Sequence, residues 1–152
     1  MKAVVTRVLS ASVALHDGTH AGETRAIGPG YLILLGVGQE DDDGTAKKLV
    51  DKILTLRIFS NVEGKFDASI TDVKGEILLI SQFTLYANLK GGRRPDFLAA
   101  ARPEKAEPLY RRAAELLAES GLTVRTGEFG AHMAVDSVND GPVTIIVETS
   151  SF

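Results

Sequence analysis

The sequence lacks cysteine altogether. Disulfide bonds, thiolate ligands for a metal and a cysteine nucleophile are therefore excluded, and the absence is typical of a cytoplasmic protein. Long apolar runs are missing as well, since no stretch approaches the roughly 18 residues of a membrane-spanning helix. Residues 1–8 have neither the apolar core nor the cleavage site of a signal peptide, and they are typical of a first strand. We therefore expect a cytoplasmic protein with no membrane partner.

An excess of positive charge is also missing. The 17 lysines and arginines are outnumbered by 20 aspartates and glutamates, which leaves a net charge of −3. A protein that covers a long stretch of nucleic acid is usually basic, because its cationic side chains replace the counterions of the phosphates. If this protein binds nucleic acid, we expect the contact to be local, at one end of the nucleic acid.

The common catalytic signatures are absent. The chain has no Gly-x-Ser-x-Gly elbow, no His-Glu-x-x-His motif and no phosphate-binding loop that ends in Gly-Lys-Ser or Gly-Lys-Thr. The histidines are His16, His20 and His132. The first two lie in a polar turn without a third ligand, so we expect them to be exposed and predict no metal site. For His132, the sequence favours a structural role as much as a catalytic one.

Three consecutive aspartates, residues 41–43, resemble the start of a calcium-binding loop. The alternating ligands and the closing glutamate of such a loop are missing. A stripe of apolar residues at helical spacing follows, formed by Ala46, Leu49, Val50, Ile53 and Leu54. We therefore predict that the aspartates cap a helix at its N-terminus, where negative charge is favourable.

The remaining pattern predicts one domain, residues 1–152, of the α+β class. Hydrophobic residues make up 44% of the chain, and no repeat or linker interrupts it. A second helix is predicted over about 104–119, although Pro108 implies either a kink or a later start. Strands are predicted over residues 2–16, 31–37, 75–80, 132–138 and 143–149. The run 31–37 is apolar throughout and is expected to be buried on both faces. This order favours a largely antiparallel sheet with two main helices.

Two short segments are the most informative. Residues 81–85 read Ser-Gln-Phe-Thr-Leu, and residues 139–144 read Asn-Asp-Gly-Pro-Val-Thr. The first is either an edge strand that turns polar as it leaves the core, or a rim of polar groups whose free backbone N–H groups hold a developing oxyanion. The second, taken alone, is most simply a hairpin turn. Its Gly141–Pro142 step is also the kind of peptide bond that adopts the cis form in some folded proteins.

Together, the two segments resemble the signature motifs of the D-aminoacyl-tRNA deacylase (D-tyrosyl-tRNA deacylase) family, bacterial/eukaryotic type. The resemblance extends over nearly the whole chain. Further landmarks fall in the family's order: Arg7, Leu34-Leu35-Gly36-Val37, Arg57-Ile58-Phe59, Arg94-Pro95-x-Phe97, Thr126-Gly127-x-Phe129 and Met133. An animal subfamily differs in the first motif, so residues 81–84 favour the bacterial type. The tail, residues 148–152, extends a little past the last strand.

The resemblance implies a fold, an activity and a partner. The fold is a twisted, barrel-like sheet, and the protein is a homodimer with two active sites at the subunit interface. The activity is hydrolysis of the ester bond of D-aminoacyl-tRNA at its 3′ acceptor end, without a cofactor. In the family the Gly-Pro bond is cis and reaches into the partner's pocket. The carbonyls of Gly141 and Pro142 would there face the α-amino group, reject L-residues by steric clash and admit glycine.

The resemblance also implies roles for single residues. Catalysis is assigned to Ser81, Gln82, Phe83 and Thr84, with the N–H groups near Gln82 and Phe83 polarising the ester carbonyl. Thr84 is expected to position the substrate rather than attack it, because the sequence offers no clearly placed base. Water attacks instead, with help from the ribose 2′-hydroxyl of the terminal adenosine.

Other residues are expected to bind the substrate. Phe129, Gly130 and Met133 match an adenosine pocket, although ordinary core packing would explain them equally well. Arg7 matches a position that braces the Gly-Pro segment. For Arg93 and Arg94, two roles stay open, contact with acceptor-stem phosphates and a merely solvated loop. Two other functions are weighed, a non-catalytic nucleic-acid-binding dimer and a metal-dependent hydrolase of small molecules.

Overall fold

Strand β1 (Lys2–Leu15) lies at the centre of the sheet in this computed structural model, which describes all 152 residues. On one side it pairs with β3 (Gly30–Gly36) along its first half and with β2 (Thr24–Ile27) along its second half. On its other side it pairs with β8 (Met133–Glu148) along nearly its whole length. All three pairings are antiparallel, so one strand organises most of the sheet.

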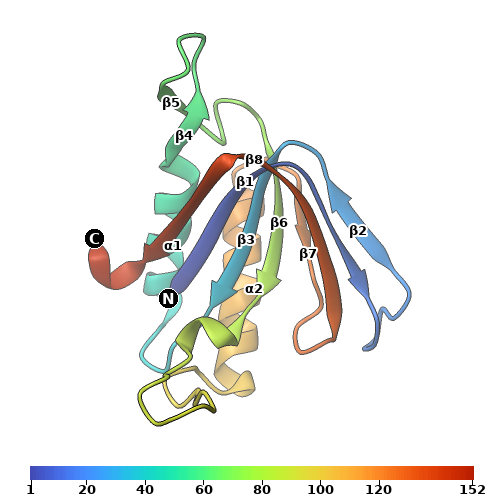
Figure 1. The fold of residues 1–152 in the computed structure, drawn as a ribbon, viewed down its shortest axis with the longest axis vertical. Helices are drawn as coiled ribbons and strands as arrows, with labels where there is room; N and C mark the ends of the chain where they lie inside the picture. Colours follow the sequence, from blue (N-terminus) through green and yellow to red (C-terminus); the bar gives the residue numbers. More distant parts are fainter.

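Two further strands extend the sheet beyond β3. Strand β6 (Glu76–Ser81) pairs with β3, and β7 (Val124–Thr126) pairs with β6, both in parallel. Figure 1 shows α1 (Asp43–Thr55) and α2 (Pro103–Glu119) on one side of the curled sheet. The predicted α+β class, with two main helices and a largely antiparallel, barrel-like sheet, is confirmed. The parallel pairings were not foreseen, and they follow from the long helical connections between these strands.

The short elements escaped prediction. Strands β4 (Arg57–Ser60) and β5 (Phe66–Ser69) form a separate two-stranded hairpin. Short 3-10 helices, η1 (Phe83–Tyr86) and η2 (Thr149–Ser151), follow β6 and β8. Strands of three or four residues, such as β2, β4, β5 and β7, are too short to display a hydrophobic period. None of the helices has the length and apolar character needed to cross a bilayer.

The interior strands are buried on both faces, as predicted for residues 31–37. Ile33 and Leu79 belong to a cluster of 23 buried residues that includes the inner faces of both helices. Their neighbours Leu32 and Leu78 point the other way, into a cluster of eight buried residues. Burial of each such side chain stabilises the fold by about 1.5–3 kcal/mol. Strands β3 and β6 are therefore held firmly in register, and so is the point at which β6 ends.

Both helices begin at residues that favour a helix N-terminus. Asp42 caps α1, since its Oδ1 accepts a hydrogen bond from the Thr45 amide (2.8 Å), which confirms the capping prediction. Helix α2 begins at Pro103, where a missing N–H costs nothing. It continues through Pro108, so the alternative of a later start is wrong. Pro108 is exposed, and water can replace its missing hydrogen bond to the Glu104 carbonyl.

The C-terminal strand differs from the prediction of two strands, 132–138 and 143–149, around a hairpin turn. Both halves belong to β8 and run antiparallel to the same strand, with Val8 opposite Asn139 and Thr6 opposite Thr144. A hairpin would reverse the chain, so the hairpin interpretation is wrong. The residues between Asn139 and Thr144 outnumber those they face on β1, and the register shifts there. The Gly-Pro step is thus an irregularity within one strand.

Asp41 is a buried charge that the capping prediction did not anticipate. Its Oδ1 lies 2.5 Å from the Met1 ammonium, and its Oδ2 accepts from the Gly38 amide (2.6 Å). The hydroxyl of Tyr86 in η1 donates to the same Oδ2 (3.3 Å). Asp41 therefore connects the start of β1, the loop after β3 and the turn after β6.

The Asp41→Ala variant is expected to lower the free energy of unfolding by about 3 kcal/mol, because it leaves the Met1 ammonium buried and uncompensated. Urea denaturation measures the change. Asp43→Ala is the control, since its exposed carboxylate pairs with Arg112 (2.9 Å). That change should cost at most about 1 kcal/mol. Equal losses in the two variants would contradict the assignment.

Candidate active site

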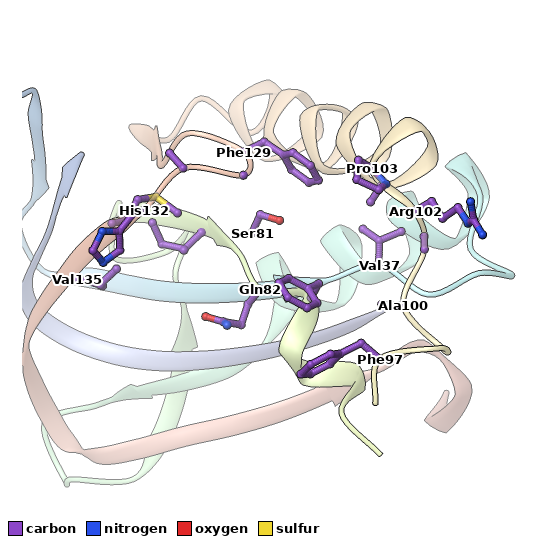
Figure 2. Close-up of a pocket in the computed structure, with 17 residues that line it drawn as sticks. Val37, Ser81, Gln82, Phe97, Ala100, Arg102, Pro103, Phe129, His132 and Val135 are labelled. Carbon is purple, nitrogen blue, oxygen red and sulfur yellow. The ribbon is translucent and has the colours of Figure 1, made fainter. Parts of the chain in front are cut away.

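A cavity of about 630 Å³ lies where β6 ends, next to η1 and the first turn of α2. Ser81, Gln82 and Phe83 line it from one side. Phe129 and Gly130 line it from the connection between β7 and β8, and Met133 lines it from the start of β8. Figure 2 shows Ser81 and Gln82 on one side of this space and Phe129 on another. The structure thus brings together six of the ten residues singled out from the sequence.

The turn after β6 places backbone amides at the cavity. The Gln82 amide, which was expected to face the substrate carbonyl, donates to Leu35 O (2.8 Å) and extends the ladder between β3 and β6. That part of the prediction is wrong. The edge-strand interpretation of residues 81–85 fails as well, because the chain turns into η1 directly after Gln82. The amides of Phe83 and Thr84 open this turn and have no hydrogen-bond partner inside it.

Glycine at position 36 lets the turn pack closely on the end of β3. A Cβ atom there would lie 3.1 Å from Gln82 O and 3.2 Å from Leu85 Cβ. Both are tighter than ordinary contacts, and one is to backbone that has little freedom to move. This close approach therefore explains the glycine in the landmark sequence Leu34-Leu35-Gly36-Val37.

Thr84 lies outside the cavity lining. Its hydroxyl accepts a hydrogen bond from the Gln82 side-chain amide and has no other side-chain partner. A threonine nucleophile needs an imidazole, carboxylate or amine within hydrogen-bond reach to take its proton. No such base is bonded to Thr84, so the side chain is arranged to hold Gln82 in place.

The opposite wall is fixed by polar anchors behind it. The Glu128 carboxylate accepts from the amides of Thr19 (2.6 Å) and His20 (2.9 Å), and these bonds lower the pKa of Glu128. The Phe129 ring lies 6.0 Å from the ring of Tyr110, whose hydroxyl donates to Leu79 O (2.8 Å). Burial raises the pKa of Tyr110, so the hydroxyl stays neutral. The Phe129 ring is therefore held in a fixed position beside the cavity.

Sequence reasoning assigned no site role to several residues of the cavity, although it weighed a catalytic role for His132. Phe97, Arg102 and His132 line the cavity, and Phe97 meets Phe83 edge-on with ring centroids 5.0 Å apart. A signal for Phe97 was present, because it belongs to the landmark Arg94-Pro95-x-Phe97. His132 is exposed, and its ring lies 5.1 Å from that of His16. No group of three or more His, Asp or Glu side chains is arranged to hold a metal ion.

The second motif lies beside the middle of β1, at the opposite end of β3 from Ser81. Ser81 is level with Leu35 and, through it, with Ala3, whereas Gly141 and Pro142 lie beside Arg7. At about 3.3 Å per residue, four residues of β1 separate the two levels by about 13 Å along the strand alone. Arg7, Gly141 and Pro142 are therefore not brought to the cavity within one chain.

Arg7 braces this second motif. Its guanidinium is buried, with Nε 3.0 Å from Asp140 Oδ2 and Nη1 donating to Ile58 O (2.5 Å). Gly141 has φ +145°, and a Cβ there would lie 2.3 Å from the Val143 nitrogen, so only glycine fits. The Gly141–Pro142 bond is cis, as the resemblance implied, and both residues are exposed.

A comparison with protein families assigns the chain. The family model described as "D-Tyr-tRNA(Tyr) deacylase" matches residues 4–148. The chain belongs to this deacylase family. A D-aminoacyl-tRNA deacylase of Symbiobacterium thermophilum is 51% identical over 98% of this chain and 96% of its own. One of Thermotoga petrophila is 47% identical over 99% of this chain and 98% of its own.

Two solved structures share the deacylase fold. A "c-Myc DNA Unwinding Element Binding Protein" superimposes with a TM-score of 0.87 and 43% identity, over 97% of this chain and 98% of its own. A probable eukaryotic D-amino acid tRNA deacylase superimposes with a TM-score of 0.85 over 96% of this chain and 97% of its own. Its identity is only 14%, so this second likeness concerns the fold alone.

Proposed function

We propose that the protein hydrolyses the ester bond of D-aminoacyl-tRNA in the cytoplasm and releases free D-amino acid and tRNA. Membership of the deacylase family supports the reaction class. The proposal rests mainly on one observation. Residues Ser81–Phe83 and Phe129–Met133 line two walls of a single cavity of about 630 Å³. A cavity of this size suits a nucleoside with an attached aminoacyl group.

The cavity divides into two parts in this proposal. The terminal adenosine lies against Phe129, Gly130 and Met133, where stacking of a base on an aromatic ring contributes about 1–3 kcal/mol. The ester carbonyl then lies at the first turn of η1, where the Phe83 amide polarises it. Because the Gln82 amide is engaged with Leu35, Phe83 takes over the role first assigned to both. An amide held in place before the reaction stabilises the developing oxyanion without reorganising.

The chemistry requires no protein nucleophile. Water adds to the ester carbonyl carbon, and the bond to the ribose oxygen breaks as the carbonyl re-forms. One proton of the water passes to the ribose oxygen, with the neighbouring 2′-hydroxyl as the relay. This route fits the isolation of Thr84 from any base.

A homodimer completes the site and supplies the chiral filter. In one chain Gly141 and Pro142 lie far from the cavity and are exposed, so they are free to enter the cavity of a second copy. Apolar residues exposed on the same strand, Val135, Val138 and Ile146, offer surface for that contact. Carbonyls of the partner would bind the α-amino group and clash with an L side chain. A glycyl group has no side chain to clash and is expected to be hydrolysed.

A nucleic-acid-binding module without activity is the second candidate. It is favoured by the 43% identical relative whose name describes DNA binding. The net charge of −3 argues against broad nucleic-acid binding, and both catalytic motifs are intact in this chain.

The first experiment is hydrolysis of D-Tyr-tRNA and L-Tyr-tRNA by the purified protein with a chelator present. We expect release of D-tyrosine, with the L-ester intact, because the filter rejects L side chains. Loss of activity with the chelator would favour the metal-dependent hydrolase. If neither ester is cleaved although uncharged tRNA binds tightly, the binding module replaces the enzyme.

The Thr84→Ala variant is expected to keep kcat for D-Tyr-tRNA within about tenfold, since its hydroxyl only positions Gln82. Single-turnover kinetics measure the rate. Thr84→Ser is the matched control, because it restores the hydroxyl alone. A loss of about 10⁴-fold or more in Thr84→Ala, rescued by serine, would indicate a covalent mechanism.

The Arg7→Ala variant is expected to lower the ratio of D-ester to L-ester cleavage by about tenfold, equivalent to about 1.4 kcal/mol. The physical reason is that Asp140, next to the Gly-Pro step, loses its cationic partner. Rates are compared at a temperature where circular dichroism shows the variant folded, and sedimentation reports its oligomeric state. The control is Arg57→Ala, an exposed arginine paired with Asp67 on the neighbouring hairpin. An unchanged ratio in folded Arg7→Ala would refute the bracing role.

A further inference from the structure

Most arginines of this protein have polar partners. Arg7, Arg25, Arg57, Arg111 and Arg112 each pair with a carboxylate. Four others have neither an ion pair nor a side-chain hydrogen bond, and three of these four, Arg93, Arg94 and Arg102, lie within ten residues of one another. All three are exposed. Unpaired, hydrated guanidinium groups gathered on one segment are available to an anionic partner.

The same segment is the most basic part of an acidic chain. Residues 88–102, here termed the basic loop, contain Lys90 as a fourth exposed cation without a side-chain partner. The one carboxylate of the basic loop is Asp96, which accepts from the Asn88 side chain (2.9 Å) and the Leu98 amide (3.3 Å). That carboxylate forms no ion pair with the four cations, so their charged groups remain available to external anions.

The basic loop is anchored to the candidate active site. Its base is closed by backbone bonds between Asn88 and Asp96 (2.8 and 3.1 Å), and Ala101 donates to Val37 O (2.9 Å). The Phe97 ring packs against Phe83 in the turn that faces the ester. Figure 1 shows the loop beyond η1, and Phe97 and Arg102 of the loop line the cavity. The cations therefore begin at the mouth of the cavity and continue outward.

Arg102 shows the direction in which the cations extend from the cavity. It lines the cavity at its edge, and Figure 2 shows its guanidinium directed away from the cavity. At the tip, Gly91 and Gly92 have open space around them, and Gly92 has φ +121°. A glycine tip allows Lys90, Arg93 and Arg94 to adjust to a ligand without strain.

We propose that the basic loop binds the phosphodiester backbone of the tRNA acceptor end, on the nucleotides that precede the terminal adenosine. The inference rests on the proposed function, which puts that adenosine in the cavity and leaves the preceding phosphates at its mouth. Arginine suits phosphate, because its planar fork donates two parallel hydrogen bonds. Phosphate contacts position a nucleic acid without reading its sequence, so the loop accepts the ends of different tRNAs. A local cationic loop also reconciles tRNA binding with the net charge of −3.

The test compares Arg93→Ala/Arg94→Ala with the parent protein on two substrates. One is D-Tyr-tRNA, and the other is D-tyrosyl-adenosine, which carries the ester but no phosphate. For D-Tyr-tRNA we expect KM to rise about tenfold near 0.1 M salt, with kcat unchanged. The slope of log(kcat/KM) against log[salt] should become shallower by about 0.7 to 0.9 for each phosphate that the variant no longer neutralises, and Arg102→Ala should show the change for one phosphate. Hydrolysis of D-tyrosyl-adenosine by the double variant should not change.

The matched control is Lys47→Ala/Lys65→Ala, which removes two exposed lysines away from the cavity and should leave both the slope and KM at the parent values. If the arginine variant keeps the parent's KM and salt slope, the basic loop does not bind phosphate, although the proposed function stands. If the variant loses activity equally on both substrates, the loop supports the catalytic turn instead, and the phosphate role is overturned. If the parent cleaves neither substrate, the proposed function fails and the inference fails with it.

Discussion

The antiparallel ladder between β1 and β8 is the constraint on which the rest of the molecule depends. It fixes the Gly141–Pro142 segment beside Arg7, whereas the pairing of β1 with β3, and of β3 with β6, fixes Ser81 at the level of Ala3. A hydrogen-bonded sheet cannot slide by one residue without turning every side chain to the opposite face. The two motifs are therefore held apart within a chain, and the proposed site needs two copies of the chain to be complete.

The cavity itself depends on what happens where a buried strand ends. Strand β6 is packed on both faces, so its last residues are rigid, and the chain leaves the sheet directly after Gln82. At that point backbone amides lose their ladder partners and can donate hydrogen bonds to a bound group. Contacts that take no part in the proposed reaction hold the turn in place. They are the close approach at Gly36, the packing of Phe97 on Phe83, and the hydrogen bond from Tyr86 to Asp41. The wall opposite is held in the same way, by Glu128 and Tyr110.

The distribution of charged side chains also suits the position of the cavity. Five of the nine arginines pair with carboxylates, and three of the other four lie on the loop that borders the cavity. An acidic protein with one cationic edge repels the body of a polyanion and attracts one part of it. This charge distribution suits a protein that binds the end of a nucleic acid rather than a long stretch of it.

The sequence by itself determined the elements with strong local signals: the apolar strand at 31–37, the capped helix after residue 42 and the long helix that ends before Gly121. The two motifs, through their resemblance to a family, also led to ten site residues, and six of them line one cavity. Local patterns failed for β2, β4, β5 and β7, which are too short to show a period, and for β8, where a glycine and a proline stand inside a strand. Only the tertiary structure decided that the Gln82 amide is occupied, that Phe97 and Arg102 border the cavity, and that Gly141 and Pro142 lie beside the middle of β1, away from the cavity. The physical reason is that periodicity and capping act between residues a few positions apart. Strand register and close packing instead join residues that are far apart in the chain, and no local pattern encodes those distances.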